Sequence, residues 1–285
     1  MPTDGLSDVP AELLETRLRR LGEGIGKVVY ASPHWVVKRQ RSPSEMLALI
    51  VIWRLLRRME RLLPWGLGKR LLERPTMQIR LLRRVLQPLV SLIPLGVWLS
   101  TRMGATWRTY RKRDRRGERL AQRYLADGEL MPRTIQFAPV WVNVQGWPGW
   151  LTVSEATERV EATLLERLQE LAQAGRFADV ERWLNRLLEV RQAGWRRGLF
   201  STDAHLKNFG VIEDRIVLLD AGGLTQSWSE IESRLAYEEG VTEPHRQLGL
   251  GGMLAEQPEM ARRFNDSWKN VVRAEVVRQH WPQQV

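Results

Sequence analysis

Residues 200–222 read FSTDAHLKNFGVIEDRIVLLDAG, and this stretch decides the predicted fold. Asp203, His205 and Asn208 lie close together in it, and an apolar strand then ends at Asp220. Phosphoryl transfer needs a carboxylate that orients the acceptor hydroxyl, and a carboxylate and an amide that hold Mg²⁺ against a triphosphate. The spacing of these residues on either side of a short hairpin predicts such a set. Each residue alone would also be compatible with an ordinary turn.

A glycine-rich turn near the N-terminus gives a second motif. Residues 21–30, LGEGIGKVVY, predict a strand, a turn and a second strand, with Gly22, Gly24 and Gly26 at the turn. Glycine lets backbone N–H groups approach phosphates that a Cβ would keep away. The next predicted strand ends at Lys38. A lysine there would reach the α- and β-phosphates of a nucleotide.

Together these motifs resemble those of the protein-kinase-like superfamily. The form D-x-H-x-x-N at residues 203–208 resembles its atypical bacterial branch, which includes aminoglycoside, choline and lipopolysaccharide-core kinases. The resemblance implies an α+β, two-lobed kinase-like fold with a compact C-lobe, and ATP and Mg²⁺ as cofactors. It assigns Asp203 to the acceptor hydroxyl, and Asn208 and Asp220 to the metal. The glycine turn has G-x-G-x-G-x-V, one residue shorter than the superfamily's G-x-G-x-x-G-x-V.

His205 keeps three interpretations at this stage. Its ring would hydrogen-bond around the catalytic loop, stabilise charge on the transferred phosphoryl group, or fill the interior of the loop. The other histidines are scattered along the chain and do not have the spacing of a metal site.

The resemblance also implies a glutamate that pairs with Lys38 and holds it against the nucleotide. Glu118 is preferred over Glu60, because residues 116–128 predict a helix that leads into two strands, as in the small lobe of these kinases. These strands are expected at 134–139 and 140–144.

A hinge is expected near residues 152–157, where Glu155 follows a strand at 150–154. In kinase-like folds the hinge backbone contacts adenine, which makes Glu155 a candidate nucleotide-binding residue. We therefore predict an N-lobe of residues 1–156 with a helical insertion at about 42–110. The small helical C-lobe is expected at 157–285, with helices at 157–174 and 177–197.

The formal charge of the 285-residue chain is +11, and most of it is local. Residues 54–119 hold 18 Lys and Arg but only four Asp and Glu. Such a segment suggests an anionic partner, and residues 42–119 are the candidate contact with an anionic membrane surface. An anionic saccharide and a solvated arginine-rich helical face are the alternatives. No specific nucleic-acid partner is expected, because no nucleic-acid-binding module is recognised.

The same region is also strongly apolar. Residues 47–63 predict an amphipathic helix, and an uncharged run of 17 residues separates Arg84 from Arg102. A membrane-spanning helix needs about 20 apolar residues, and two prolines and a glycine interrupt this run. An interfacial hairpin, a buried hairpin, an oligomer interface and a span all remain open.

The composition restricts the chemistry and the location. The chain has no cysteine, which excludes disulfides and thiolate metal sites. No basic start followed by an apolar run is present at the N-terminus, so we expect no secretory signal. The expected location is cytoplasmic, with peripheral binding to the inner face of the membrane as an option.

The sequence thus predicts an ATP- and Mg²⁺-dependent phosphotransferase. No Ala-Pro-Glu segment follows Asp220, and only 65 residues remain after it, which favours a small-molecule, saccharide or lipid acceptor over a protein. One alternative is a non-catalytic pseudokinase, favoured by the short glycine turn and by Ser201, where most relatives have histidine. The other is transfer of AMP on the same fold.

Overall fold

The computed structural model describes residues 7–23, 26–43, 45–46, 102–125, 127–146 and 148–282. The chain is mixed α+β and divides into two compact units. The first comprises the residues up to 112 together with 135–156, and the second comprises 113–134 together with 157–285. These units differ from the predicted lobes in residues 113–134, which belong with the second unit.

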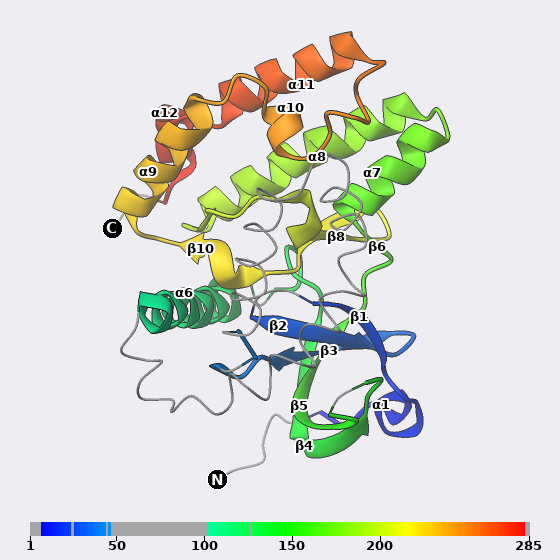
Figure 1. Cartoon of the computed structure of the whole chain (residues 1–285). Coiled ribbons are helices and arrows are strands. Elements are labelled where there is room, and N and C mark those ends of the chain that lie inside the picture. Colours follow the sequence, from blue (N-terminus) through cyan, green and yellow to red (C-terminus); the bar gives the residue numbers. More distant parts are fainter. Residues whose placement is uncertain are drawn as a thin grey trace, which may run out of the picture. The chain divides into compact units, whose positions relative to one another are not determined.

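A five-stranded sheet in the order β1-β2-β3-β5-β4 forms the first unit (Figure 1). β1 pairs with β2, and β2 with β3, in antiparallel register. The elements of this unit are α1 (Ala11–Glu15), β1 (Arg19–Glu23), β2 (Lys27–Ala31), β3 (Trp35–Gln40), β4 (Thr134–Asn143) and β5 (Trp150–Glu158).

Alternation of apolar residues gives this sheet one buried face. Val28 and Tyr30 on β2 and Val37 on β3 are each about 1% exposed, and Phe137 on β4 packs in the same cluster. Val29, which alternates with the buried residues of β2, is partly buried, and Lys38, which follows Val37 on β3, is exposed. A period of two places such residues on opposite faces of a strand, so the candidate nucleotide residues lie on the face away from the core.

Helices build most of the second unit around a large apolar core. α8 lies at its centre and packs against α7, α11 and α12. Trp195 and Leu187 on α8 are almost fully buried. The helices are α6 (Arg102–Tyr124), whose C-terminal half belongs to this unit, α7 (Leu164–Gln173), α8 (Phe177–Arg196), α9 (Trp228–Glu239), α10 (Pro244–Gln247), α11 (Pro258–Val271) and α12 (Ala274–His280).

Short strands carry the loops with the candidate catalytic residues. β8 and β9 form the predicted hairpin before Asp220, and β7 pairs with β10. The hairpin turn contains Glu213 at φ 53°. The elements are β6 (Ala162–Thr163), β7 (Phe200–Ser201), η1 (Leu206–Asn208), β8 (Phe209–Ile212), β9 (Arg215–Leu218), η2 (Ala221–Gly223) and β10 (Leu224–Thr225).

Two predicted breaks between elements are wrong. The strands expected at 134–139 and 140–144 form one strand, β4, which runs through Pro139. β4 is the last strand in the sheet order, and an edge strand tolerates the missing N–H of proline. The hinge expected at 152–157 lies within β5, which continues to Glu158.

Two predicted helix starts are also wrong. The helix expected from 116 begins at Arg102, so the predicted insertion at 42–110 runs into α6. The helix expected from 157 begins at Leu164, because Thr163 and Glu166 form a reciprocal capping box there. A strong local cap therefore sets the start of α7 and leaves the preceding residues to β5 and β6.

The most apolar segments lie outside the described residues, including the helix predicted at 47–63 and the uncharged run after Arg84. In the part of the chain that the structure describes, no helix has the length and apolar character needed to cross a bilayer.

Candidate active site

The loop between β7 and β8 holds Asp203, His205 and Asn208. The backbone N–H of Asn208 donates to the carbonyl of His205 over 2.8 Å, which closes the turn into η1. The Asn208 side-chain Nδ2 donates to the backbone carbonyl of Asp203 over 3.2 Å. The Asp203 side chain is 45% exposed. The loop is thus fixed through its backbone, while the Asp203 carboxylate faces solvent.

Asp220 begins the second loop, immediately after β9. Its Oδ1 accepts a hydrogen bond of 3.0 Å from the N–H of Gly222 and so caps η2. The N–H of Leu219 donates to the carbonyl of Asn208 over 2.8 Å. The two residues predicted to bind the metal are therefore held on neighbouring backbone segments of the second unit.

Gly223 joins the second loop to the first. Its carbonyl accepts hydrogen bonds of 2.9 Å from both the N–H and the hydroxyl of Thr202. A Cβ at position 223 would lie 2.9 Å from the Cβ of Asp203 and 3.1 Å from its backbone nitrogen, which is too close for a side chain. The structure thereby brings Asp203, Asn208 and Asp220 together, and glycine at 223 is needed for that approach.

Helix α6 packs on the second loop through residues that the sequence analysis missed. A Cβ at Gly117 would lie 1.9 Å from the carbonyl oxygen of Ala221, and one at Gly222 would lie 2.8 Å from Oδ1 of Asp114. Asp114 is only 3% exposed. Asp114 and Gly117 are three residues apart and so share one face of the helix. Glycine inside a helix lowers stability by about 1 kcal/mol relative to alanine. A glycine within a predicted helix was therefore the available sequence sign that another segment approaches the helix closely.

Two arginines of α6 contact other parts of the second unit. Arg113 Nη2 donates to the hydroxyl of Thr202, next to Asp203 in the loop between β7 and β8. Arg116 forms two hydrogen bonds, of 2.8 and 2.7 Å, with the carboxylate of Glu230 on α9. These bonds raise the pKa of the Arg116 guanidinium and lower the pKa of the Glu230 carboxyl. Part of the basic segment thus contacts the loop that holds Asp203, and another part contacts α9.

His205 lies beside Asp203 but does not fill the loop interior. Its side chain is 66% exposed, and its Nε2 lies 3.6 Å from Oδ1 of Asp203. This distance is within ion-pair range but is too long for a hydrogen bond. Its interpretation as a group near the transferred phosphoryl stays a prediction.

The first unit aligns two of the predicted nucleotide-binding residues. Gly22 on β1 is opposite Val29 on β2, and Val29 is opposite Lys38 on β3. Residues directly opposite one another across strands project from the same face. The space where a Gly22 Cβ would lie is open to at least 4 Å. The bare backbone at Gly22 and the exposed lysine therefore share one face.

The other candidates have different surroundings. A Cβ at Gly26 would lie 2.6 Å from the Tyr110 ring, so this glycine serves packing within the first unit. Glu155 is exposed on β5, and Gly24 and Glu60 lie outside the described residues. Glu118 is partly exposed on α6 and belongs to the second unit, whereas Lys38 belongs to the first. The pairing of Lys38 with Glu118 stays a prediction.

The residues present fit a metal that is held partly by a nucleotide. Among the described residues, no group of three or more His, Asp or Glu side chains is arranged to bind a metal. Asn208 and Asp220 supply one amide oxygen and one carboxylate. Mg²⁺ is usually bound by one or two such protein groups, with phosphate oxygens and water completing its shell.

Neither a protein-family model nor a curated protein sequence matches this chain. The resemblance to kinase-like proteins thus depends on the residues described above.

Proposed function

We propose that this chain is an ATP- and Mg²⁺-dependent phosphotransferase of the atypical kinase-like class, with a two-lobed fold. Its acceptor would be a hydroxyl group of a small molecule, a saccharide or a lipid. The observation that carries the proposal is the joined pair of loops in the second unit, which holds Asp203, Asn208 and Asp220 together. Two unrelated turns would need neither the close approach of Gly223 to Asp203 nor the backbone hydrogen bonds that join the two loops.

The first unit adds independent support. In protein kinases the nucleotide lysine lies on the third strand, and a glycine-rich turn precedes it. Here Lys38 is on β3 and shares a sheet face with Gly22 of β1. Under this proposal Gly22, Gly24 and Gly26 form the phosphate-binding turn, Lys38 contacts the α- and β-phosphates, and Glu118 orients Lys38. Glu155 would lie beside the adenine.

Each candidate site residue of the second unit has a role in the proposed reaction. The acceptor oxygen attacks the γ-phosphorus, the bond from that phosphorus to the β–γ bridging oxygen breaks, and ADP leaves. Asp203 orients the acceptor hydroxyl and accepts its proton. Asn208 and Asp220 would hold Mg²⁺, which neutralises charge on the phosphate oxygens. The exposed His205 would lie near the transferred group.

A pseudokinase is the second candidate, and the environment of Ser201 favours it. Position 201 has a histidine or a similar orienting group in most kinase-like proteins. Here the Ser201 hydroxyl is buried, and within the described chain it has no hydrogen-bond partner, so it does not orient Asp203. AMP transfer on the same metal site is a further outcome that the product would reveal.

Turnover distinguishes these candidates. We expect wild-type protein to consume labelled ATP in the presence of one acceptor class from a panel of metabolites, saccharides and lipids. Asp203→Asn should still bind ATP but lose turnover, since Asp203 is assigned to the acceptor. A product that gains one phosphoryl group supports the proposal, whereas a product that gains AMP supports nucleotidyl transfer. Absence of ATP consumption with every acceptor class would favour the pseudokinase.

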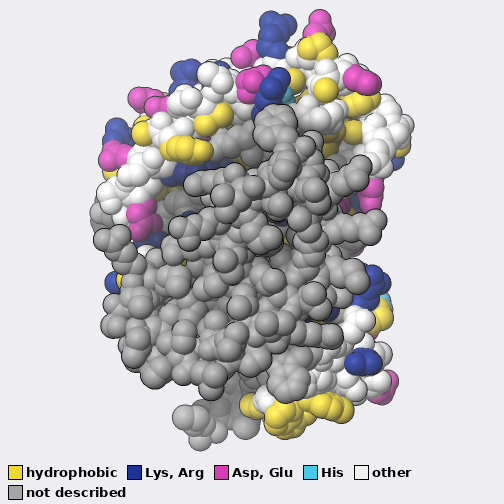
Figure 2. All heavy atoms as spheres, in the orientation of Figure 1, with side chains coloured by type: hydrophobic (Ala, Val, Ile, Leu, Met, Phe, Trp, Pro, Cys, Tyr) yellow, Lys and Arg dark blue, Asp and Glu magenta, His cyan; other side chains and the backbone are white. Residues whose placement is uncertain are grey.

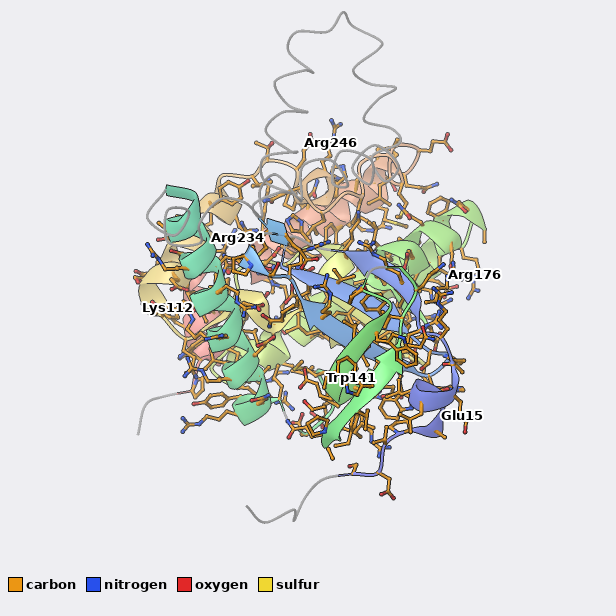
Figure 3. All side chains as sticks on the ribbon, turned by 60° about the horizontal axis from the view of Figure 1, so that its bottom comes forward. Glu15, Lys112, Trp141, Arg176, Arg234 and Arg246 are labelled. Carbon is orange, nitrogen blue, oxygen red and sulfur yellow. The ribbon has the colours of Figure 1, made fainter. Side chains whose placement is uncertain are left out.

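An anionic membrane surface is the proposed partner of residues 42–119, with peripheral binding at the cytoplasmic face. Exposed cations on α6 support this, among them Lys112, Arg115 and Arg119 (Figure 3 labels Lys112). No specific nucleic-acid partner is proposed. An oligomer interface in the apolar part of the segment remains the alternative.

A further inference from the structure

A cavity in the second unit lies between α10 and α11 and has a volume of about 470 Å³. This size is typical of small-molecule sites. None of the residues that line it belongs to the loops at 200–208 or 220–223. Whatever it binds is therefore distinct from the proposed reaction at Asp203.

A buried histidine with a fixed proton lies in the wall of this cavity. His245 is 6% exposed, and its backbone N–H donates to Oδ1 of Asn265 over 3.0 Å. The same oxygen lies 3.1 Å from the ring atom Nδ1 of His245. Because an amide oxygen only accepts, Nδ1 must carry a proton. The other ring nitrogen, Nε2, has no hydrogen-bond partner in the described chain and remains for a ligand.

Two cations lie on the same wall. Arg262 and Lys269 line the cavity from α11, seven residues apart and so on one helix face. Neither has an ion-pair partner among the described residues. Asp266 lies on the same face and offsets one of the two charges. Two further lining residues, Arg246 and Glu243, form an ion pair in which Nε lies 3.1 Å from Oε2, so together they add no net charge.

Surface charge alone does not distinguish this cavity from the rest of the helical surface. Figure 2 shows cationic and acidic side chains interspersed over the helices at the top of the view, and Figure 3 shows Arg246 extending from α10. The cavity differs from that surface because it combines two cations and a histidine with an apolar wall. That wall is formed by Leu254, Pro258 and Ala261.

We propose that this cavity binds an organic phosphate monoester with a small apolar body. A phosphate monoester has three terminal oxygens and up to two negative charges. Arg262 and Lys269 would donate to those oxygens, and charged donors make the strongest hydrogen bonds. With the ring proton on Nδ1, Nε2 of His245 would accept a hydrogen bond from the P–OH group of the singly charged monoester. A carboxylate has no O–H group that could donate to Nε2. The apolar body would lie against Leu254 and Pro258.

Titration calorimetry on the full chain with phenyl phosphate tests this. We expect phenyl phosphate to bind, inorganic phosphate to bind more weakly and phenol not to bind. Arg262→Gln and Lys269→Gln should each weaken phenyl phosphate binding about tenfold, as expected for loss of one charge-assisted hydrogen bond. Arg196→Gln, an exposed arginine at the end of α8 outside the cavity, is the matched control and should leave the affinity unchanged.

Sedimentation with lipid vesicles distinguishes a lipid-borne phosphate monoester from a soluble one. Sedimentation with phosphatidic acid vesicles but not with phosphatidylglycerol vesicles, lost in Arg262→Gln/Lys269→Gln, would assign a lipid-borne phosphate. Binding of phenyl phosphate without vesicle binding would assign a soluble ester.

Two results would overturn the proposal. One is no binding of phenyl phosphate at millimolar concentration. The other is an affinity that survives Arg262→Gln/Lys269→Gln but is lost in Asp220→Ala, which would place the phosphate at the candidate active site. The variants in α11 leave the proposed ATP site intact, so failure here does not count against the phosphotransferase.

Discussion

Gly117 shows how a single residue sets the geometry of the candidate site. It lies inside α6, where alanine would normally be the better residue by about 1 kcal/mol. The missing side chain lets the helix approach the Ala221 carbonyl, which a Cβ would meet at 1.9 Å. Because the Ala221 loop starts at Asp220, this contact supports the predicted metal ligand.

Gly117→Ala should therefore destabilise the protein although it improves helix propensity. We expect the clash to cost roughly 1–3 kcal/mol of unfolding free energy, as for overpacked sites. The matched control is Gly194→Ala inside α8, where a Cβ would lie 3.5 Å from the nearest atom, the Leu199 carbonyl oxygen. The control should be neutral or slightly stabilising. Equal stabilisation of both variants in urea unfolding would contradict the close approach of α6.

Glu12 in the first unit gives a pH-dependent prediction. Its carboxylate accepts hydrogen bonds from the Ser32 hydroxyl over 2.6 Å and from the His34 N–H over 3.1 Å, and it lies 3.0 Å from His34 Nδ1. Burial raises the pKa of this carboxyl, but the hydrogen bonds from Ser32 and His34 outweigh burial, and the pKa is lowered.

A lowered pKa in the folded state means that Glu12 stabilises the fold above the unfolded pKa of about 4.3. This contribution should disappear as the pH falls through the folded pKa. We expect Glu12→Gln to lower stability near neutral pH and to weaken its dependence on pH in the acid range. Glu15→Gln, on the same short helix and exposed, is the control (Figure 3). Parallel urea-unfolding curves from pH 3 to 7 for wild type and Glu12→Gln would refute this.

At the scale of elements, α8 is tied to its neighbours by a buried arginine. Arg191 Nη2 lies 3.3 Å from Glu238 Oε2 on α9, and both side chains are almost fully buried. The guanidinium carbon lies 4.5 Å from the centre of the Trp268 ring on α11 and 5.7 Å from that of Phe200 on β7. Burial lowers the pKa of Arg191, and Glu238 opposes that shift. Since β7 leads into the loop with Asp203, this pair connects three helices to the candidate site.

Removing one partner of this pair should cost more than replacing both. Arg191→Ala should destabilise the protein, because it leaves the buried Glu238 carboxylate with Arg234 as its remaining ion-pair partner among the described residues and removes the ring contacts of Arg191 with Trp268 and Phe200. Arg191→Met combined with Glu238→Leu should lose less than Arg191→Ala, since no buried charge remains and Arg234, which also binds Glu238 at 2.7 Å, can turn to solvent. Additive losses in a double-mutant cycle by chemical denaturation would contradict a coupled buried pair.

For the whole molecule, the sequence predicted element types better than their limits. The hairpin before Asp220 and the strand with Lys38 are confirmed because their apolar alternation is strong. The single strand β4 and the early start of α6 were missed, since the tolerance of Pro139 depends on an edge position that only the sheet order reveals. The contacts of Gly117 and Asp114 depend on tertiary approach, and the only local sign of it is the unfavourable glycine inside a predicted helix. The hydrogen bonds of Arg113 and Arg116 likewise come from residues far apart in sequence.

Binding to anionic liposomes is the molecule-scale test of the basic segment. We expect sedimentation with anionic liposomes and less with neutral ones, and reduced sedimentation in high salt as the Debye length falls from ~10 Å to ~3 Å. Lys112→Glu/Arg115→Glu/Arg119→Glu should weaken binding, since each cation contributes on the order of 1 kcal/mol near an anionic surface. Arg113 and Arg116 are kept because their side chains bond to Thr202 and to Glu230 on α9. Equal partitioning onto neutral and anionic liposomes would remove the charge-based explanation.

The most direct test of the central claim is the thermal stabilisation of the chain by ATP with Mg²⁺. At 100 times its dissociation constant, the nucleotide should stabilise wild-type protein by about 2.7 kcal/mol. Asp203→Asn should keep this shift, and Asp220→Ala should lose its Mg²⁺-dependent part. An unchanged ATP and Mg²⁺ shift in Asp220→Ala would contradict a metal-binding role for the loop that α6 and Gly223 hold against Asp203.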